Sequence, residues 1–118
     1  MSAPSTPGVI VIVEDPFIRR FVRNVLGRLG YAVIESDEKD ALQLASESPG
    51  GVKLLITNRP DVFECLDRAV PILYLSATPD WELAARFSNL RVLQKPFHPH
   101  ELLEAVGRVT GQSSRTAS

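Results

Sequence analysis

Five polar side chains stand at the ends of apolar runs, and their types suit the binding of a cation or a phosphate. They are Glu14, Asp15, Asn58, Ser76 and Lys95. Adjacent carboxylates are the oxygen ligands that Mg²⁺ prefers, and a lysine is a point charge that holds a phosphate or a carboxylate. The spacing alone equally allows a simpler interpretation, in which the acidic pair caps a helix and the lysine is solvated.

Asn58 decides which chemistry such a cluster can perform. It ends the apolar run at residues 52–58, which is typical of a buried central strand. In an open parallel sheet, ligands gather at the carboxyl ends of the strands, so Asn58 should lie at the mouth of any site. An amide is neutral and weakly nucleophilic, where a carboxylate would be a metal ligand and a covalent acceptor.

The elements that position these side chains alternate along the chain. Short apolar runs predict strands, and helical spacing of apolar residues predicts helices between them. The expected strands are 9–13, 31–35, 52–58, 71–75 and 90–94, and the expected helices are 16–29, 37–48, about 60–68, 79–87 and 99–109. This alternation predicts an α/β fold with a five-stranded, doubly wound parallel sheet. Lys95-Pro96 is a candidate cis peptide bond.

Length and composition limit the class of protein. The 118 residues, 44% of them hydrophobic, predict one domain at residues 8–110 between loose tails at 1–7 and 111–118. Thirteen basic and fourteen acidic residues argue against bulk attraction to nucleic acid or membrane. The start of the chain does not resemble a signal peptide, and no apolar run is long enough to span a bilayer, so we expect a cytoplasmic protein.

Several segments together resemble the receiver domain of bacterial two-component response regulators. They are residues 11–16, 30–33, 54–58, 71–77, 95–97 and 101–103, and the resemblance covers residues 8–111. It implies a flavodoxin-like sheet of order 2-1-3-4-5. In that family the acidic pair and the aspartate ending the third strand bind Mg²⁺, and that aspartate accepts phosphate from a histidine kinase. The Ser or Thr ending the fourth strand and the Lys hold the phosphoryl oxygens.

The resemblance carries over to Glu14, Asp15, Ser76 and Lys95 but fails at three places. Asn58 stands where the phosphoacceptor belongs, cannot form an acyl phosphate, and weakens Mg²⁺ binding by removing a charge. Ser76 follows Asn58 by only 18 positions, which implies a shortened third helix. Val92 replaces the aromatic switch residue of many members.

The departures favour an atypical receiver that is not an enzyme, is not phosphorylated at Asn58 and requires no cofactor. It would act by dimerisation or by contact with a histidine kinase, a phosphotransfer protein or an output protein. One alternative is a receiver that is phosphorylated at Asp61. Another is a regulatory domain that binds a small ligand in the pocket of Glu14, Asp15, Ser76 and Lys95, where Lys95 and Asp15 could form a constitutive ion pair.

Other reactive side chains have simpler interpretations. Cys65 is the only cysteine, so it excludes an internal disulfide, and beside Leu66 we expect it to be buried and inert. His98 and His100 have poor spacing for a metal and are expected to be surface residues.

Two surfaces are candidates for partner binding. Arg19, Arg20, Arg23 and Arg28 lie on the polar face of the first helix, which is either solvated or a docking surface for an acidic protein. Trp81 either contributes to the usual dimer face of the family or folds onto its own sheet.

Overall fold

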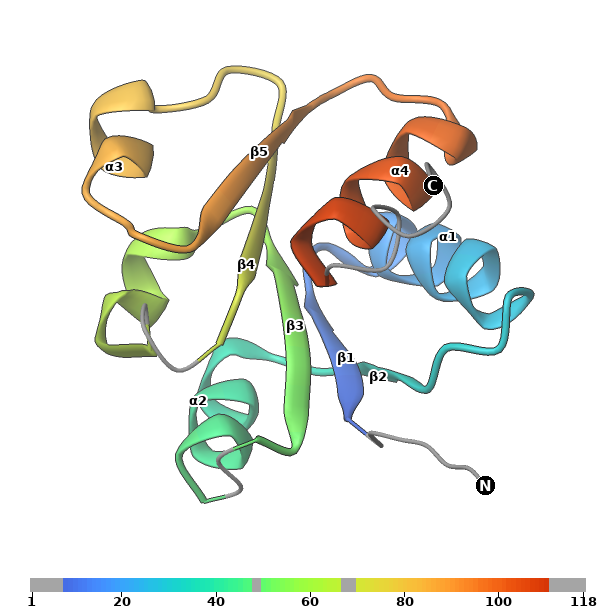
Figure 1. Ribbon diagram of the computed structural model, residues 1–118, viewed down its shortest axis with the longest axis horizontal. Helices are drawn as coiled ribbons and strands as arrows, with labels where there is room; N and C mark the ends of the chain where they lie inside the picture. The colour runs from blue at the N-terminus through green and yellow to red at the C-terminus, as the bar shows by residue number, and fades with distance from the viewer. Residues whose placement is uncertain (1–7, 48–49, 67–69, 111–118) are drawn as a thin grey trace, which may run out of the picture.

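The computed structural model describes residues 8–47, 50–66 and 70–110, which form a parallel sheet between two layers of helices (Figure 1). The order of the strands is β2-β1-β3-β4-β5, and every neighbouring pair is parallel. The elements are β1 (Val9–Val13), α1 (Pro16–Gly27), β2 (Val33–Glu35), α2 (Glu38–Glu47), β3 (Val52–Thr57), η1 (Pro60–Leu66), β4 (Ile72–Ser76), α3 (Trp81–Ala85), β5 (Leu90–Gln94) and α4 (Pro99–Thr110). The predicted fold class and strand order are confirmed.

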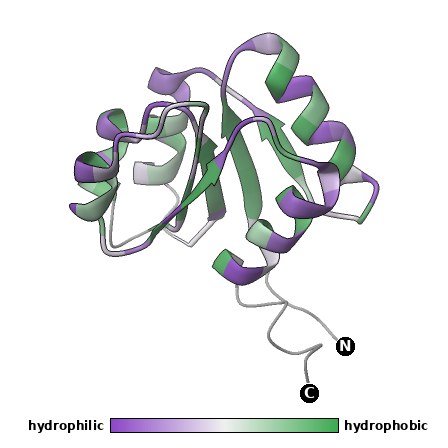
Figure 2. Cartoon of the chain, turned by 90° about the horizontal axis from the view of Figure 1, so that it is seen from above, coloured by the Kyte–Doolittle hydropathy of each residue, from purple (hydrophilic) through white to green (hydrophobic). Residues whose placement is uncertain are grey.

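The apolar runs form strands because both faces of the central sheet are covered. Residues of α1 and α4 pack on one face, around Ile12, Leu54 and Leu73. Residues of α2, η1 and the segment after α3 pack on the other face, around Val11 and Leu55. Figure 2 shows the hydrophobic strands enclosed between helices whose outer sides are hydrophilic.

Strand register aligns the candidate site at one edge of the sheet. Val13 pairs with Thr57, Thr57 pairs with Tyr74, and Tyr74 pairs with Val92. Glu14 and Asn58 therefore follow paired residues on neighbouring strands. The Lys95–Pro96 bond is cis, as predicted.

The main differences from the predicted elements lie in short segments. β2 has three residues rather than five, because Tyr31 and Ala32 lie between the strand and the turn that ends at Gly30, whose φ is +91°. The segment after β3 is a 3₁₀ helix with non-helical angles at Phe63, since few residues connect β3 to β4. α3 has five residues rather than the nine expected.

Some expectations fall outside the described residues. They include both tails and the ends of two predicted helices, at residue 48 and at 67–68. Within the described ranges, no helix is both long enough and apolar enough to cross a membrane.

Candidate functional site

The centre of the predicted site is an ion pair between Glu14 and Lys95. The Glu14 side chain is fully buried, and its Oε2 lies 2.9 Å from Nζ of Lys95, a side chain that is 24% exposed. The other oxygen, Oε1, accepts a hydrogen bond of 3.1 Å from the backbone N–H of Asp15. Both oxygens of the carboxylate are therefore already engaged within the protein.

Asp15 is turned toward helix α1 rather than toward the lysine. Its Oδ1 accepts hydrogen bonds of 3.1 Å from the backbone N–H groups of Phe17 and Ile18, so that Asp15 is the N-cap of α1. The helix-capping interpretation is thus correct for Asp15. The Lys95–Asp15 ion pair considered for a ligand-binding domain is not formed, because the lysine is paired with Glu14 instead.

Ser76 and Lys95 are joined through the backbone. The N–H of Lys95 donates to the carbonyl of Ser76 at 2.9 Å, while the Ser76 hydroxyl accepts from the N–H of Thr78 at 3.0 Å. Val92 is half-buried on β5, beside Tyr74 of β4. Because residue 92 is a valine, this position of β5 has no aromatic ring that could change between two orientations.

Asn58 is exposed and faces a different hollow from the ion pair. It lines a pocket of about 590 Å³ whose other lining residues are Pro60, Asp61, Tyr74, Asp80, Glu82, Leu83 and Arg86. Asp61 shares this pocket and is ion-paired with Arg59 at 3.4 Å. The structure thus brings Asn58 and Asp61 together in one pocket, while Glu14 follows the neighbouring strand β1 and Lys95 follows β5, two strands from β3.

Tyr74 is a site residue that the sequence pattern did not indicate. It is buried, it lines the Asn58 pocket, and its hydroxyl accepts a 3.0 Å hydrogen bond from the N–H of Asp80. Asp80 in turn caps α3 by accepting from the N–H of Leu83. In the sequence, a single tyrosine within a mainly aliphatic strand, two positions before its end, could have indicated this role.

The arrangement does not fit a divalent cation. Glu14 is neutralised by Lys95, Asp15 caps a helix, and Asn58 carries no charge. No group of three or more His, Cys, Asp or Glu side chains in the described part of the chain could hold a metal ion. Mg²⁺ ligation would require the Glu14–Lys95 pair to open.

The remaining reactive residues lie at the surface. Cys65 is exposed, and the prediction that it is buried is wrong, because the kinked 3₁₀ helix turns Leu66 and Phe63 inward instead. His98 and His100 are exposed, as expected, and their rings stack at 6.1 Å.

The arginines of α1 are not equivalent. Arg19 and Arg23 both approach Glu35 of β2, at 3.5 and 3.6 Å, so part of the positive charge on this face is paired within the protein. Arg20 is exposed and has no ion pair among the described residues.

An apolar pocket of about 500 Å³ adjoins the ion pair, since Lys95 is one of its lining residues. Its lining residues are Phe17, Ile18, Phe21, Ala77, Lys95, Pro96 and Phe97. Phe17 is 78% exposed. Trp81 is 61% exposed, so the alternative in which it folds onto its own sheet is wrong.

Solved structures identify the fold. The receiver domain of the hybrid histidine kinase CckA is 27% identical over 87% of this chain and 99% of its own, with a TM-score of 0.66. The chemotaxis protein CheY4 of Vibrio cholerae is 27% identical over 86% of this chain and 98% of its own, with a TM-score of 0.67. This chain has the receiver-domain fold of two-component signalling.

A response regulator from Thermotoga maritima shares the receiver fold at 21% identity, with a TM-score of 0.72, over 91% of this chain and 99% of its own. No protein-family model matches the sequence, and no curated protein is significantly similar to it.

Proposed function

We propose that this receiver domain does not accept phosphate at Asn58 and acts instead by binding another signalling protein. The observation that carries the proposal is the buried ion pair between Glu14 and Lys95, 2.9 Å apart, at the same edge of the sheet as the amide of Asn58, which follows β3. Acyl phosphate formation needs a carboxylate nucleophile, which Asn58 does not supply. The lysine that would hold the phosphoryl oxygens is already neutralised by Glu14. On this account the domain catalyses no reaction and needs no Mg²⁺.

The apolar pocket beside α1 supports docking of a protein partner. Phe17 exposes most of its ring at the rim, with Arg20 three positions further along the same helix. Exposed aromatic residues beside an apolar pocket are typical of binding hot spots, and an exposed arginine on the same helix favours an acidic partner. We therefore expect the partner to be a histidine kinase, a phosphotransfer protein or an output protein that presents a helix with apolar and acidic side chains.

Calorimetric titration against kinase dimerisation domains and phosphotransfer domains of the same organism would test this surface. Phe17→Ala and Arg20→Glu should each weaken binding about tenfold or more, because truncating a hot-spot residue costs about 2 kcal/mol. Arg91→Glu is the control of matched charge, since Arg91 is exposed near the start of β5, away from the carboxyl ends of the strands. Equal effects of Arg20→Glu and Arg91→Glu would refute the proposed surface.

Self-association is a second candidate, favoured by the exposure of Trp81. An indole that is 61% exposed on a five-residue helix is an unusual use of the only tryptophan in the chain. We propose that it contributes to a homodimer, whose formation would be governed by concentration rather than by phosphate.

A further inference from the structure

The exposed Trp81 and the apolar pocket beside α1 lie on opposite layers of the molecule. Leu83 of α3 packs on the sheet face that α2 and η1 cover. Ile18 and Phe21, which line the pocket, pack on the face that α1 and α4 cover. Figure 1 shows α3 and α1 on opposite sides of the sheet. One chain can therefore present its indole to one neighbour and its pocket to another.

The segment before α3 holds Trp81 in its exposed position. The N–H of Asp80 donates a 3.0 Å hydrogen bond to the hydroxyl of the buried Tyr74, and Oδ1 of Asp80 accepts from the N–H of Leu83 at 3.0 Å. These bonds fix the start of α3 to β4. The indole is thus already ordered in the free chain, which lowers the entropic cost of using it in an interface.

The surface around Trp81 carries uncompensated negative charge. Asp80 and Glu82 flank Trp81 in the sequence, and neither forms an ion pair in the described part of the chain. Arg86, which lines the same pocket as these two carboxylates, is paired with Glu64 instead. A two-fold dimer centred on Trp81 would bring these carboxylates against their own copies, and like charges facing each other oppose association.

The surface of α1 beside the apolar pocket carries the opposite charge. Arg20 follows Phe17 by three positions, so the two side chains are neighbours on the helix surface. Arg20 is exposed and forms no ion pair within the described ranges. Arg19 and Arg23 share the single carboxylate of Glu35, so this face of α1 keeps an excess of positive charge.

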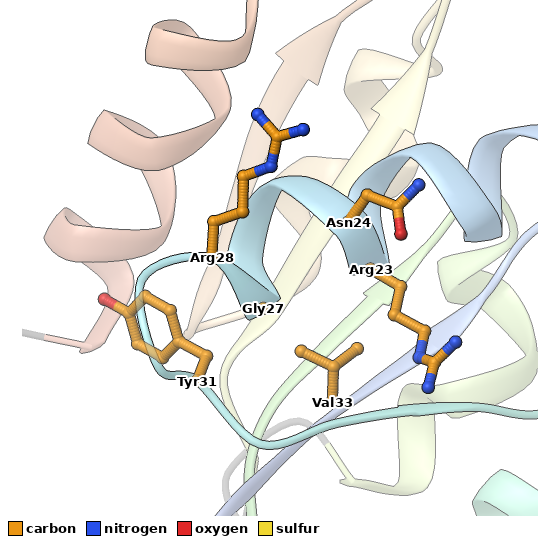
Figure 3. Close-up of a pocket in the computed structure, with 6 residues that line it drawn as sticks. All are labelled: Arg23, Asn24, Gly27, Arg28, Tyr31 and Val33. Atoms are coloured by element: carbon orange, nitrogen blue, oxygen red, sulfur yellow. The ribbon is translucent and has the colours of Figure 1, made fainter.

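The far end of α1 is also cationic, but it belongs to a different pocket, of about 610 Å³. The residues that line it are Arg23, Asn24, Gly27, Arg28, Tyr31 and Val33. Figure 3 shows the guanidinium groups of Arg23 and Arg28 directed apart. Arg28, the C-cap residue of α1, is exposed and lies outside the lining of the apolar pocket. It therefore offers a control of the same charge as Arg20.

From these observations we propose that Trp81 of one chain inserts into the apolar pocket of a second copy, in a head-to-tail contact. The proposal rests on the self-association proposed above and specifies its geometry. The pocket, of about 500 Å³, is large enough for an indole, and its lining includes the rings of Phe17, Phe21 and Phe97, against which an indole can pack. The carboxylates beside Trp81 then face the arginines of α1, so opposite charges meet across the contact.

A head-to-tail contact joins two different surfaces, so its smallest assembly is a dimer that does not close on itself. One Trp81 and one apolar pocket remain free in such a dimer. Further copies can add at either end, and the assembly either closes into a ring or continues as an open chain. The free pocket can still receive a signalling partner.

Sedimentation of two variants, alone and mixed, tests this geometry. Trp81→Ala removes the indole, and Phe17→Glu places a carboxylate at the rim of the pocket. Both positions are exposed, so both variants should keep the native thermal transition. The native chain should form dimers and larger species as its concentration rises, and each variant alone should associate about tenfold or more weakly. An equimolar mixture should form a heterodimer and nothing larger, because one variant keeps the pocket and the other keeps the indole.

Charge reversal on α1 gives a second measurement. Arg20→Glu should weaken association of the otherwise native chain about fivefold, because it opposes the carboxylates beside Trp81. Arg28→Glu, the control, should weaken association less than about twofold. Equal weakening by the two variants would mean general electrostatic attraction and would contradict a contact at this pocket.

The outcomes separate the geometry from self-association itself. Dimerisation of Phe17→Glu as strong as that of the native chain would overturn the head-to-tail contact and leave self-association through Trp81 intact. A mixture that stays monomeric, while both variants keep the native thermal transition, would also overturn it. A native chain that is monomeric at every concentration would refute self-association, and this geometry with it.

Discussion

The fully buried carboxylate of Glu14 depends on a single cation. Its Oε2 makes no other hydrogen bond among the described residues, and Nζ of Lys95 lies 2.9 Å away. Removing one partner of a buried ion pair strands the other charge away from water, which costs more than the pair itself contributes. The pair therefore holds the ends of β1 and β5 in one arrangement, and it does so without phosphate.

Lys95→Met should lower the free energy of unfolding by about 3 kcal/mol, because Glu14 would be left buried and unpaired. Urea denaturation measures the change, and the double variant Glu14→Gln with Lys95→Met is the control. The double variant should recover most of the loss. A loss below about 1 kcal/mol in the single variant would show that the pair is solvated.

At the scale of elements, two glycines near the end of α1 have different structural roles. Gly27 is the last residue of the helix and has open space where a side chain would be, while Gly30 has φ of +91° in the turn that follows. Glycine lowers helix stability relative to alanine, but it is favoured where φ is positive. The turn needs the second glycine and the helix does not need the first for packing.

Gly27→Ala should raise the free energy of unfolding by about 0.5–1 kcal/mol, whereas Gly30→Ala should lower it by about 1 kcal/mol. Thermal unfolding of the two variants measures the opposite signs. Destabilisation by Gly27→Ala would mean that the space beside this residue is filled in solution.

Elements with long apolar runs were predictable from the sequence, and short or kinked elements were not. The β-branched run of β1 and the strand that ends at Thr57 have one stable solution, a central strand covered on both faces. The η1 segment lacks such a pattern, so the burial of Phe63 and the exposure of Cys65 depend on a kink that spacing does not reveal.

The position of the site was predictable from the sequence, but the choice of carboxylate that pairs with Lys95 was not. Strand ends place Glu14, Asn58, Ser76 and Lys95 at one edge, as the alternation of elements required. Which carboxylate meets the lysine depends on side-chain direction, because Asp15 can cap α1 while Glu14, one residue earlier, points inward. The role of Tyr74 could not be predicted, because an aromatic residue in a buried strand is ordinarily part of the core.

For the molecule as a whole, exposed apolar side chains indicate where partners bind. Large exposed hydrophobic residues in the described chain include Phe17 on α1 and Trp81 on α3, which lie on opposite layers of the fold (Figure 1). A module that passes a signal by contact needs at least one such surface, and two would let it join a partner to a second copy of itself.

Trp81→Ala should weaken self-association in a sedimentation series over concentration, while changing the free energy of unfolding by no more than about 0.5 kcal/mol. Leu29→Ala is a matched control, because Leu29 is also 61% exposed. Identical sedimentation of the native chain and Trp81→Ala at every concentration would rule out this interface.

The absence of phosphorylation at Asn58 is tested most directly by intact mass spectrometry after incubation with acetyl phosphate and Mg²⁺. The Asn58→Asp variant is treated alongside the native chain. We predict no phosphate adduct on the native protein, because its amide cannot form an acyl phosphate. An adduct on Asn58→Asp alone would show that this one side chain blocks the reaction, and its absence there as well would place the block in the Glu14–Lys95 pair. An adduct on native protein would contradict the account and direct attention to Asp61.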